Sequence, residues 1–208
     1  CHSAFNILCT MLMLPLAGML EKMVKKMIPD NEVIEQTEEL DSRLLGSPSL
    51  ALERCGQVLD SMARIAVSAM KDSIGSITKY DEEIALRIRE AEEKTDHLED
   101  ILGTYLVKLT STQLGENESA KATEYMKLIG DYERIADHAV NILQSSEELV
   151  QKDIVFSAEA QEEFNKISGA VEDILDLSYL AFKDTDLKAS RETEPLEQIV
   201  DEMKEMLR

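Results

Sequence analysis

The sequence contains few of the residues that interrupt helices or favour strands. Its 208 residues include 8 glycines, 4 prolines, 5 tyrosines, 4 phenylalanines and no tryptophan. Alanine, leucine, glutamate, lysine and methionine dominate instead, and these residues favour helices. The composition therefore predicts an all-α protein and argues against folds built from strands. With a hydrophobic fraction of 44%, the chain can bury a core.

Cysteine is also scarce, with three residues in the whole chain. Cys1, Cys9 and Cys55 have no paired spacing, so they form neither a disulfide framework nor a thiolate zinc site. This cysteine usage is typical of a protein in a reducing compartment.

Basic residues are outnumbered by acidic ones, 22 against 42, which gives a formal net charge of −20. Such a charge repels phosphate backbones, and the sequence has no basic stripe that would overcome the repulsion. We therefore expect no nucleic-acid partner.

An uncharged apolar segment occupies residues 4–20, and three lysines follow within residues 22–26. A helix of that length spans about 25 Å, the lower limit for crossing a bilayer. The pattern predicts a membrane helix within residues 1–28. Because positive charges stay on the cytoplasmic side, the residues after this helix would lie in the cytoplasm. The alternative is a helix packed on the rest of the chain, which Asn6, Pro15 and the short length favour.

Residues 29–48 are polar and acidic and include Gly46 and Pro48, so they are predicted to be a linker. The domain that follows, residues 49–208, has apolar residues at three- and four-residue steps. Long helical stretches separated by short polar turns favour an antiparallel bundle. The predicted helices are Ser49–Ile77, Asp81–Thr110, Ser119–Leu149, Ser157–Lys183 and Pro195–Arg208.

A faint internal repeat relates two parts of this domain. Residues 61–72 are similar to residues 173–184, and Glu92–Asp96 then corresponds to Glu197–Asp201. The chain is therefore predicted to contain one three-helix repeat followed by two-thirds of a second.

Acidic residues recur four positions apart on the predicted helices. Side chains at this spacing project from one helix face, and hard cations bind such carboxylate and amide oxygens. One helix supplies only two or three ligands, so a site would need two facing helices. Chance also produces such pairs in an acidic chain, as at Glu172 and Asp176, and a solvated acidic face is the alternative. The candidate metal ligands are Glu92, Asp96, Glu133, Asp137, Asn141, Glu197 and Asp201.

Sequence motifs of common enzymes are missing. No Glu-x-x-His di-iron motif precedes His97 or His138, and the sequence has no phosphate-binding glycine loop or nucleophile elbow. We therefore expect the protein not to be an enzyme.

The segment Glu133–Ile142 (ERIADHAVNI) resembles the signature third helix of the PhoU family. The resemblance covers about residues 50–208 and implies six helices in two three-helix repeats, with the second repeat incomplete here. It further implies that Glu92, Asp96, Glu133, Asp137 and Asn141 form one metal site. Glu197 and Asp201 would begin a second site, whose remaining ligands would come from a sixth helix beyond Arg208. The cofactor would be a divalent or trivalent ion such as iron, zinc, manganese or magnesium.

The N-terminal segment His2–Asn6 (HSAFN), followed by Leu14 and Pro15, resembles the last membrane helix of bacterial sodium/phosphate cotransporters. This likeness implies a C-terminal regulatory part of a phosphate cotransporter, anchored in the cell inner membrane, with residues 29–208 in the cytoplasm. Its partners would be the upstream transporter domain, phosphate and a second copy of the chain.

Two other functions are compatible with the same sequence. One is a free PhoU-type regulator that acts on a phosphate transporter and its sensor kinase. The other is a helical interaction bundle that binds no metal.

Overall fold

The computed structural model describes residues 40–184 and 187–206. They form a short 3₁₀ helix, η1 (Ser42–Gly46), and five α-helices: α3 (Pro48–Thr78), α4 (Glu82–Thr110), α5 (Glu116–Gln151), α6 (Ala158–Asp184) and α7 (Leu187–Met206). The predicted membrane helix, within residues 1–28, lies outside the described residues. Among the residues that are described, no helix has the length and apolar character needed to cross a bilayer.

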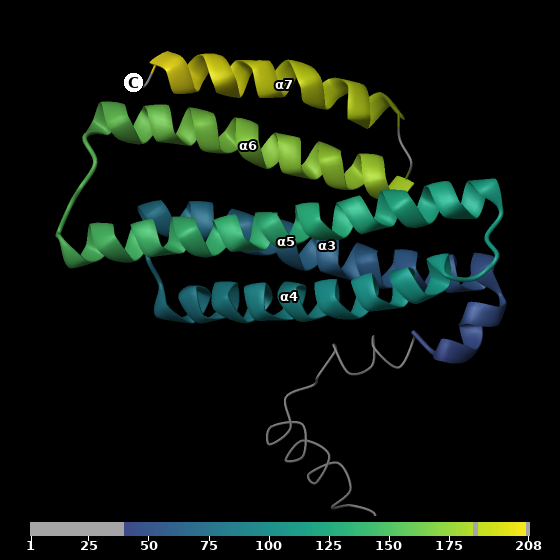
Figure 1. The fold of residues 1–208 in the computed structure, drawn as a ribbon. Coiled ribbons are helices and arrows are strands. Elements are labelled where there is room, and N and C mark those ends of the chain that lie inside the picture. The colour runs from purple at the N-terminus through teal and green to yellow at the C-terminus, as the bar shows by residue number, and fades with distance from the viewer. Residues whose placement is uncertain (1–39, 185–186, 207–208) are drawn as a thin grey trace, which may run out of the picture. The chain divides into compact units, whose positions relative to one another are not determined.

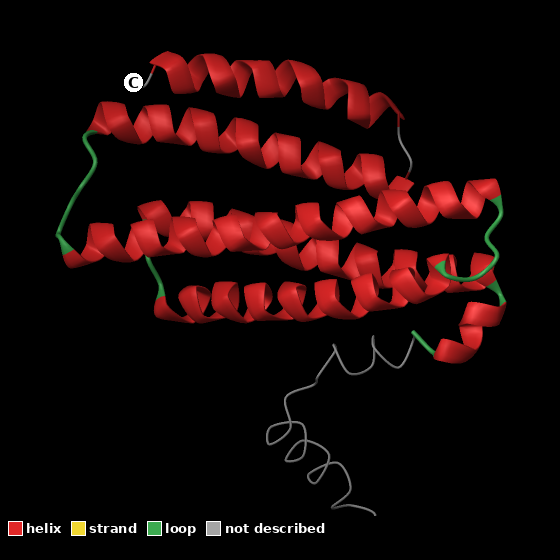
Figure 2. Cartoon of the chain, viewed as in Figure 1, coloured by secondary structure: helices red, strands yellow, loops and turns green. Residues whose placement is uncertain are grey.

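The helices run up and down, so that each is antiparallel to the next along the chain (Figure 1). Helices α3, α4 and α5 pack against one another as a three-helix unit, α6 contacts α3, and α7 packs on α6. Helices account for nearly all of the described chain, and the connections are short (Figure 2). The predicted all-α bundle is confirmed for this part of the chain.

The core lies between α3, α4 and α5. Each helix presents apolar side chains at three- and four-residue steps, and these side chains meet along the axis of the unit. Helix α4 contributes a row of leucines that solvent does not reach, and α3 and α5 close over it. The largest fully buried side chains include Leu59, Met62, Ile88, Leu98, Leu102, Leu106, Leu109 and Leu143.

The helix starts follow local capping chemistry. Asp81 accepts hydrogen bonds from the backbone N–H groups of Glu83 and Ile84, which begins α4 one residue after the predicted Asp81. Helix α5 begins at Glu116, so the predicted start at Ser119 is wrong. The Glu118 carboxylate accepts from the Gly115 N–H at 3.0 Å, which stabilises the first turn within the predicted loop.

Helix α7 begins at Leu187, eight residues before the predicted start at Pro195. Proline favours a helix start because it lacks an N–H group, but here Pro195 lies inside the helix. The segment before it, LKASRETE, consists mostly of strong helix formers, which offsets the hydrogen bond that proline cannot donate.

The last residues of the predicted linker 29–48 are part of the packed unit, which begins at Leu40. Leu40 is 8% exposed. The Asp41 side chain accepts from the Arg43 N–H at the start of η1, and the Tyr105 hydroxyl on α4 donates to the Asp41 carbonyl at 3.1 Å. These contacts fix the entry of the chain into α3.

Helix α6 is attached to the three-helix unit by apolar packing and by specific polar contacts. Its partly buried apolar side chains pack against core residues of α3, α4 and α5. Lys71 Nζ on α3 lies 2.6 Å from the Asp176 carboxylate, and the Tyr179 hydroxyl donates to Asp60 at 2.8 Å. Leu175, which is 9% exposed, is the most deeply buried of the described side chains of α6 and α7. Because the fully buried side chains belong to α3, α4 and α5, helices α6 and α7 should open more easily than those three.

We therefore predict that Tyr179→Phe makes the amides of α6 exchange faster with solvent. The substitution keeps the ring but removes the hydrogen bond to Asp60, a loss of about 1 kcal/mol, or about fivefold in the opening equilibrium. Native-state hydrogen exchange resolved by residue measures this change. Exchange in the centres of α3, α4 and α5 should be unaffected.

A matched control is Lys166→Gln, which removes a salt bridge to Glu162 within α6 itself. That exposed pair contributes little and does not link α6 to another helix. If Tyr179→Phe and Lys166→Gln changed the exchange of α6 equally, the hydroxyl contact with Asp60 would not hold this helix in place.

Candidate functional site

The candidate site lies on the outer surface of α4 and α5, whose relative register is set by burial and one charged contact. The Arg89 guanidinium on α4 donates two hydrogen bonds to Glu147 on α5, at 2.7 and 2.9 Å. Because the helices are antiparallel, the residues that follow Arg89 on α4 lie beside the residues that precede Glu147 on α5 (Figure 1). This register brings the two acidic segments next to each other.

On α4, one face of the helix is buried, so the acidic residues lie on the opposite, solvent-facing side. Thr95 and Leu98 are fully buried against the neighbouring helices. Glu92 is half-buried and Asp96 is exposed, so both lie at the solvent side of the helix. Residues at positions 92, 96 and 99 share one face, because they are four and seven residues apart.

On α5, the corresponding acidic residues flank the buried stripe. Tyr132 and Ala136 are buried, whereas Glu133 is half-buried and Asp137 is exposed. Asn141 follows one turn later and is also exposed.

Partial burial and neighbouring like charges both act on Glu133. Burial raises the pKa of its carboxyl above the usual range. Repulsion from Asp137, Glu99 and Asp96 and a hydrogen bond with Asp137 raise the pKa further. A carboxyl–carboxyl hydrogen bond requires a proton on one partner, so this pair favours the uptake of a proton or another positive charge.

Glu92 shows the same effect from the other helix. Burial raises the pKa of Glu92, and repulsion from Asp137 on α5 and from Asp96 and Glu93 on α4 adds to the increase. The interaction between Glu92 and Asp137 crosses from one helix to the other. The structure therefore brings together four of the residues predicted for the first site: Glu92, Asp96, Glu133 and Asp137.

Glu99 belongs to the same acidic face and was not among the predicted residues. Its charge raises the pKa of Glu133 across the helix pair. The signal was present in the sequence, because Glu99 lies seven residues after Glu92 and three after Asp96. We call the set Glu92, Asp96, Glu99, Glu133 and Asp137 the acidic face.

The carboxylates of the acidic face interact, but they are not assembled into a coordination shell. Within the part of the chain that the structure describes, no group of three or more histidine, cysteine, aspartate or glutamate side chains is arranged to hold a metal ion. The donor chemistry suits a hard cation, because every available ligand is an oxygen. His97 and His138 are both exposed.

The other predicted ligands lie on α7. Glu197 and Asp201 are exposed and border an open acidic depression with Glu194, Glu202 and Glu205. Helix α7 packs against α6, and neither α4 nor α5 is among the helices with which it makes extensive contact. The structure therefore does not bring Glu197 and Asp201 to the acidic face.

The fold and the acidic face together define a three-helix domain with paired acidic motifs on two adjacent helices. Residues 59–146, which run from α3 through α5, match the family model of the PhoU domain. This part of the chain is a PhoU domain, and it contains the whole acidic face. No curated protein and no solved structure matches the chain. The match does not extend to the N-terminal segment that resembles a sodium/phosphate cotransporter.

The raised pKa of Glu133 leads to a prediction for stability. The folded-state pKa lies above the unfolded value of about 4.3, so the folded protein binds the proton more tightly and loses stability as the pH rises through this window. Glu133→Gln should therefore raise the free energy of unfolding at neutral pH by about 0.2–0.5 kcal/mol. Urea unfolding as a function of pH measures the difference, which should disappear below about pH 4.

The control is Glu124→Gln, the same change at an exposed position of α5 outside the acidic face. Its effect on stability should stay near zero across the same pH range. A Glu133→Gln variant that is less stable than the parent at neutral pH would contradict the conclusion that burial and repulsion disfavour the charged carboxylate at this position.

Proposed function

We propose that this protein regulates phosphate transport or phosphate signalling through its PhoU domain, as a binding protein without catalytic activity. The observation that carries the proposal is the electrostatic coupling of Glu92 on α4 with Asp137 on α5, inside the matched residues 59–146. This coupling gives the domain an acidic surface that gains energy from binding a cation.

We further propose that the acidic face binds a hard metal ion, with Glu92, Asp96, Glu133 and Asp137 as the principal ligands. Asn141 and Glu99 lie within reach of the same surface by their helical spacing. Oxygen-only donors favour magnesium, manganese or iron over zinc, which prefers nitrogen and sulfur. Because the side chains are at least partly exposed, their rotamers can adjust when the ion binds.

A bound cation would also explain how so acidic a protein could interact with phosphate. With a formal net charge of −20, the chain repels a free anion. A metal ion on the acidic face reverses the local charge and leaves positions for phosphate or for an anionic group of a partner protein.

The metal proposal predicts that Mn²⁺ stabilises the protein. At a free metal concentration of about 100 times Kd, the free energy of unfolding should increase by about 2.7 kcal/mol. Asp137→Asn should weaken binding by about tenfold or more, because it removes one ligand of the acidic face. Equilibrium dialysis with elemental analysis measures the affinity, and urea unfolding measures the stabilisation.

Asp131→Asn is the matched control, since Asp131 is also exposed on α5 but lies on a different side of the helix. It should leave Mn²⁺ affinity within about twofold of the parent. Equal affinities for the parent, Asp137→Asn and Asp131→Asn would reject the acidic face as the site. Failure of the parent to bind Mn²⁺, Mg²⁺, Fe³⁺ or Zn²⁺ would favour a metal-free interaction bundle.

The regulatory proposal predicts complementation in cells. In a bacterium whose own PhoU-type regulator has been deleted, the full chain should restore repression of a phosphate-starvation reporter and normal phosphate uptake. The Asp137→Asn variant should restore less than the parent, while Asp131→Asn should match it. Lack of any rescue by a chain that is expressed and folded would argue against this function.

Fractionation of the same cells distinguishes a free regulator from a regulatory part of a membrane-anchored transporter. A free regulator is recovered in the soluble fraction, whereas the predicted membrane segment in residues 1–28 would retain the full chain with the inner membrane.

A further inference from the structure

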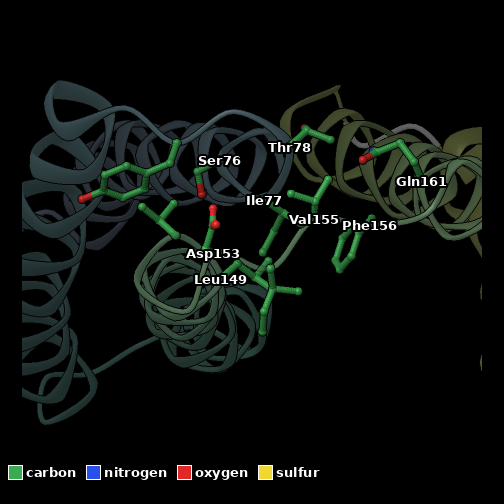
Figure 3. A pocket seen from close by; sticks show the side chains of 11 residues that line it. Ser76, Ile77, Thr78, Leu149, Asp153, Val155, Phe156 and Gln161 are labelled. Carbon is green, nitrogen blue, oxygen red and sulfur yellow. The ribbon is translucent and has the colours of Figure 1, made fainter.

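A second site of interest lies at the end of the bundle where α3 and α5 end and α6 begins. A cavity of about 310 Å³ opens there, about 24 Å along α5 from Asp137 (Figure 3). Its volume is at the lower end of the range for small-ligand pockets. The apolar residues that line it are Ile77, Leu149, Val150, Ile154, Val155 and Phe156.

Several of these apolar side chains are exposed at the rim of the cavity. Val155 is 85% exposed, Val150 is 56% exposed and Ile154 is 49% exposed. The cavity therefore offers an apolar surface that a ligand with a hydrocarbon portion would remove from water. Ser76, Thr78, Tyr80 and Gln161 add neutral polar groups to the lining.

Asp153 supplies the only charged side chain among the described residues that line the cavity. Figure 3 shows its carboxylate directed toward Ser76 on α3. The Ser76 hydroxyl already donates to the Ser73 carbonyl at 2.6 Å. Among the described residues, none forms a hydrogen bond or an ion pair with the Asp153 carboxylate.

The backbone at Asp153 is unusual for an aspartate. Its φ of 52° makes it the only non-glycine residue with positive φ in the described chain. The Asp153 N–H donates to the Val150 carbonyl and the Ile154 N–H donates to the Leu149 carbonyl, which is the Schellman arrangement at the end of α5. Glycine usually occupies this position, and asparagine is the next best choice.

Asp153 is exposed and lies just beyond the C-terminal end of α5. The C-terminal end of a helix carries a partial negative charge, so an aspartate just beyond α5 is repelled. Helix α3 ends at Thr78, beside the same cavity, and adds a second negative end. Residues whose backbone conformation or charge is unusual for their position often occur at functional sites.

We propose that this cavity binds an aliphatic ammonium group, with the hydrocarbon stem on the apolar walls and the charged nitrogen at the Asp153 carboxylate. The cation would relieve the repulsion between Asp153 and the ends of α3 and α5. Either a free aliphatic amine or a lysine side chain of a partner protein presents this chemistry.

The test uses n-pentylamine as the probe and follows the backbone amides of residues 149–156 in the full chain by NMR titration. Its neutral counterpart, 1-pentanol, has the same stem without the charge. We expect n-pentylamine to bind about fivefold more tightly than 1-pentanol at low ionic strength. Equal affinity for the two probes, or no binding of either, would overturn the proposal.

Asp153→Asn and Asp153→Gly test the role of the carboxylate. Both residues tolerate positive φ, so the end of α5 should keep its structure while losing the charge. The preference for the amine should disappear in both variants. Asp173→Asn, the same change at an exposed position of α6, should keep the preference. A preference that survived in both Asp153 variants would contradict the assignment.

The source of the ammonium group is distinguished by Nα-acetyl-lysine methylamide, which presents a lysine side chain as a protein does. Binding of this compound at the level of n-pentylamine supports recognition of a partner's lysine. Binding of n-pentylamine alone supports a free amine as the ligand.

Discussion

Burial of the leucine row of α4 between α3 and α5 is the constraint on which the acidic face depends. Leu98, Leu102, Leu106 and Leu109 are fully excluded from solvent, which fixes both the rotation and the register of α4. Once these leucines point inward, Glu92, Asp96 and Glu99 lie on the outer side of α4, close to acidic residues of α5. Apolar burial therefore brings acidic residues of α4 close to acidic residues of α5, like charges that would stay apart if the two helices did not pack.

The cost of that proximity is small beside the core that imposes it. Each like-charge pair costs a few tenths of a kcal/mol at the surface, whereas each buried leucine contributes about 1.5–3 kcal/mol. Partial burial and the repulsion between these charges together raise the pKa values of Glu92 and Glu133. A domain can therefore keep such an acidic surface without losing its fold, because the core contributes far more than the repulsion costs.

The acidic face and the cavity beside Asp153 are similar in one respect. In both places the fold determines the position of an acidic group, by helix packing in one case and by the Schellman turn in the other. Both places therefore favour cations, but they differ in chemistry. The acidic face offers several oxygens and little apolar surface, whereas the cavity offers one carboxylate and apolar walls.

Periodicity in the sequence was enough to predict the five helices, because a buried face requires apolar residues every three or four positions. It did not locate the starts of α5 and α7, which depend on the contact between Glu118 and Gly115 and on the helix formers before Pro195. Spacing within a helix likewise identified the acidic pairs, since residues four apart share a face. Tertiary packing decided which acidic pairs lie close to each other, and it brought Glu99 close to Glu133. It also formed the cavity beside Asp153. The sequence alone could not show these features, because contacts between helices depend on the relative register of the helices, which no local pattern encodes.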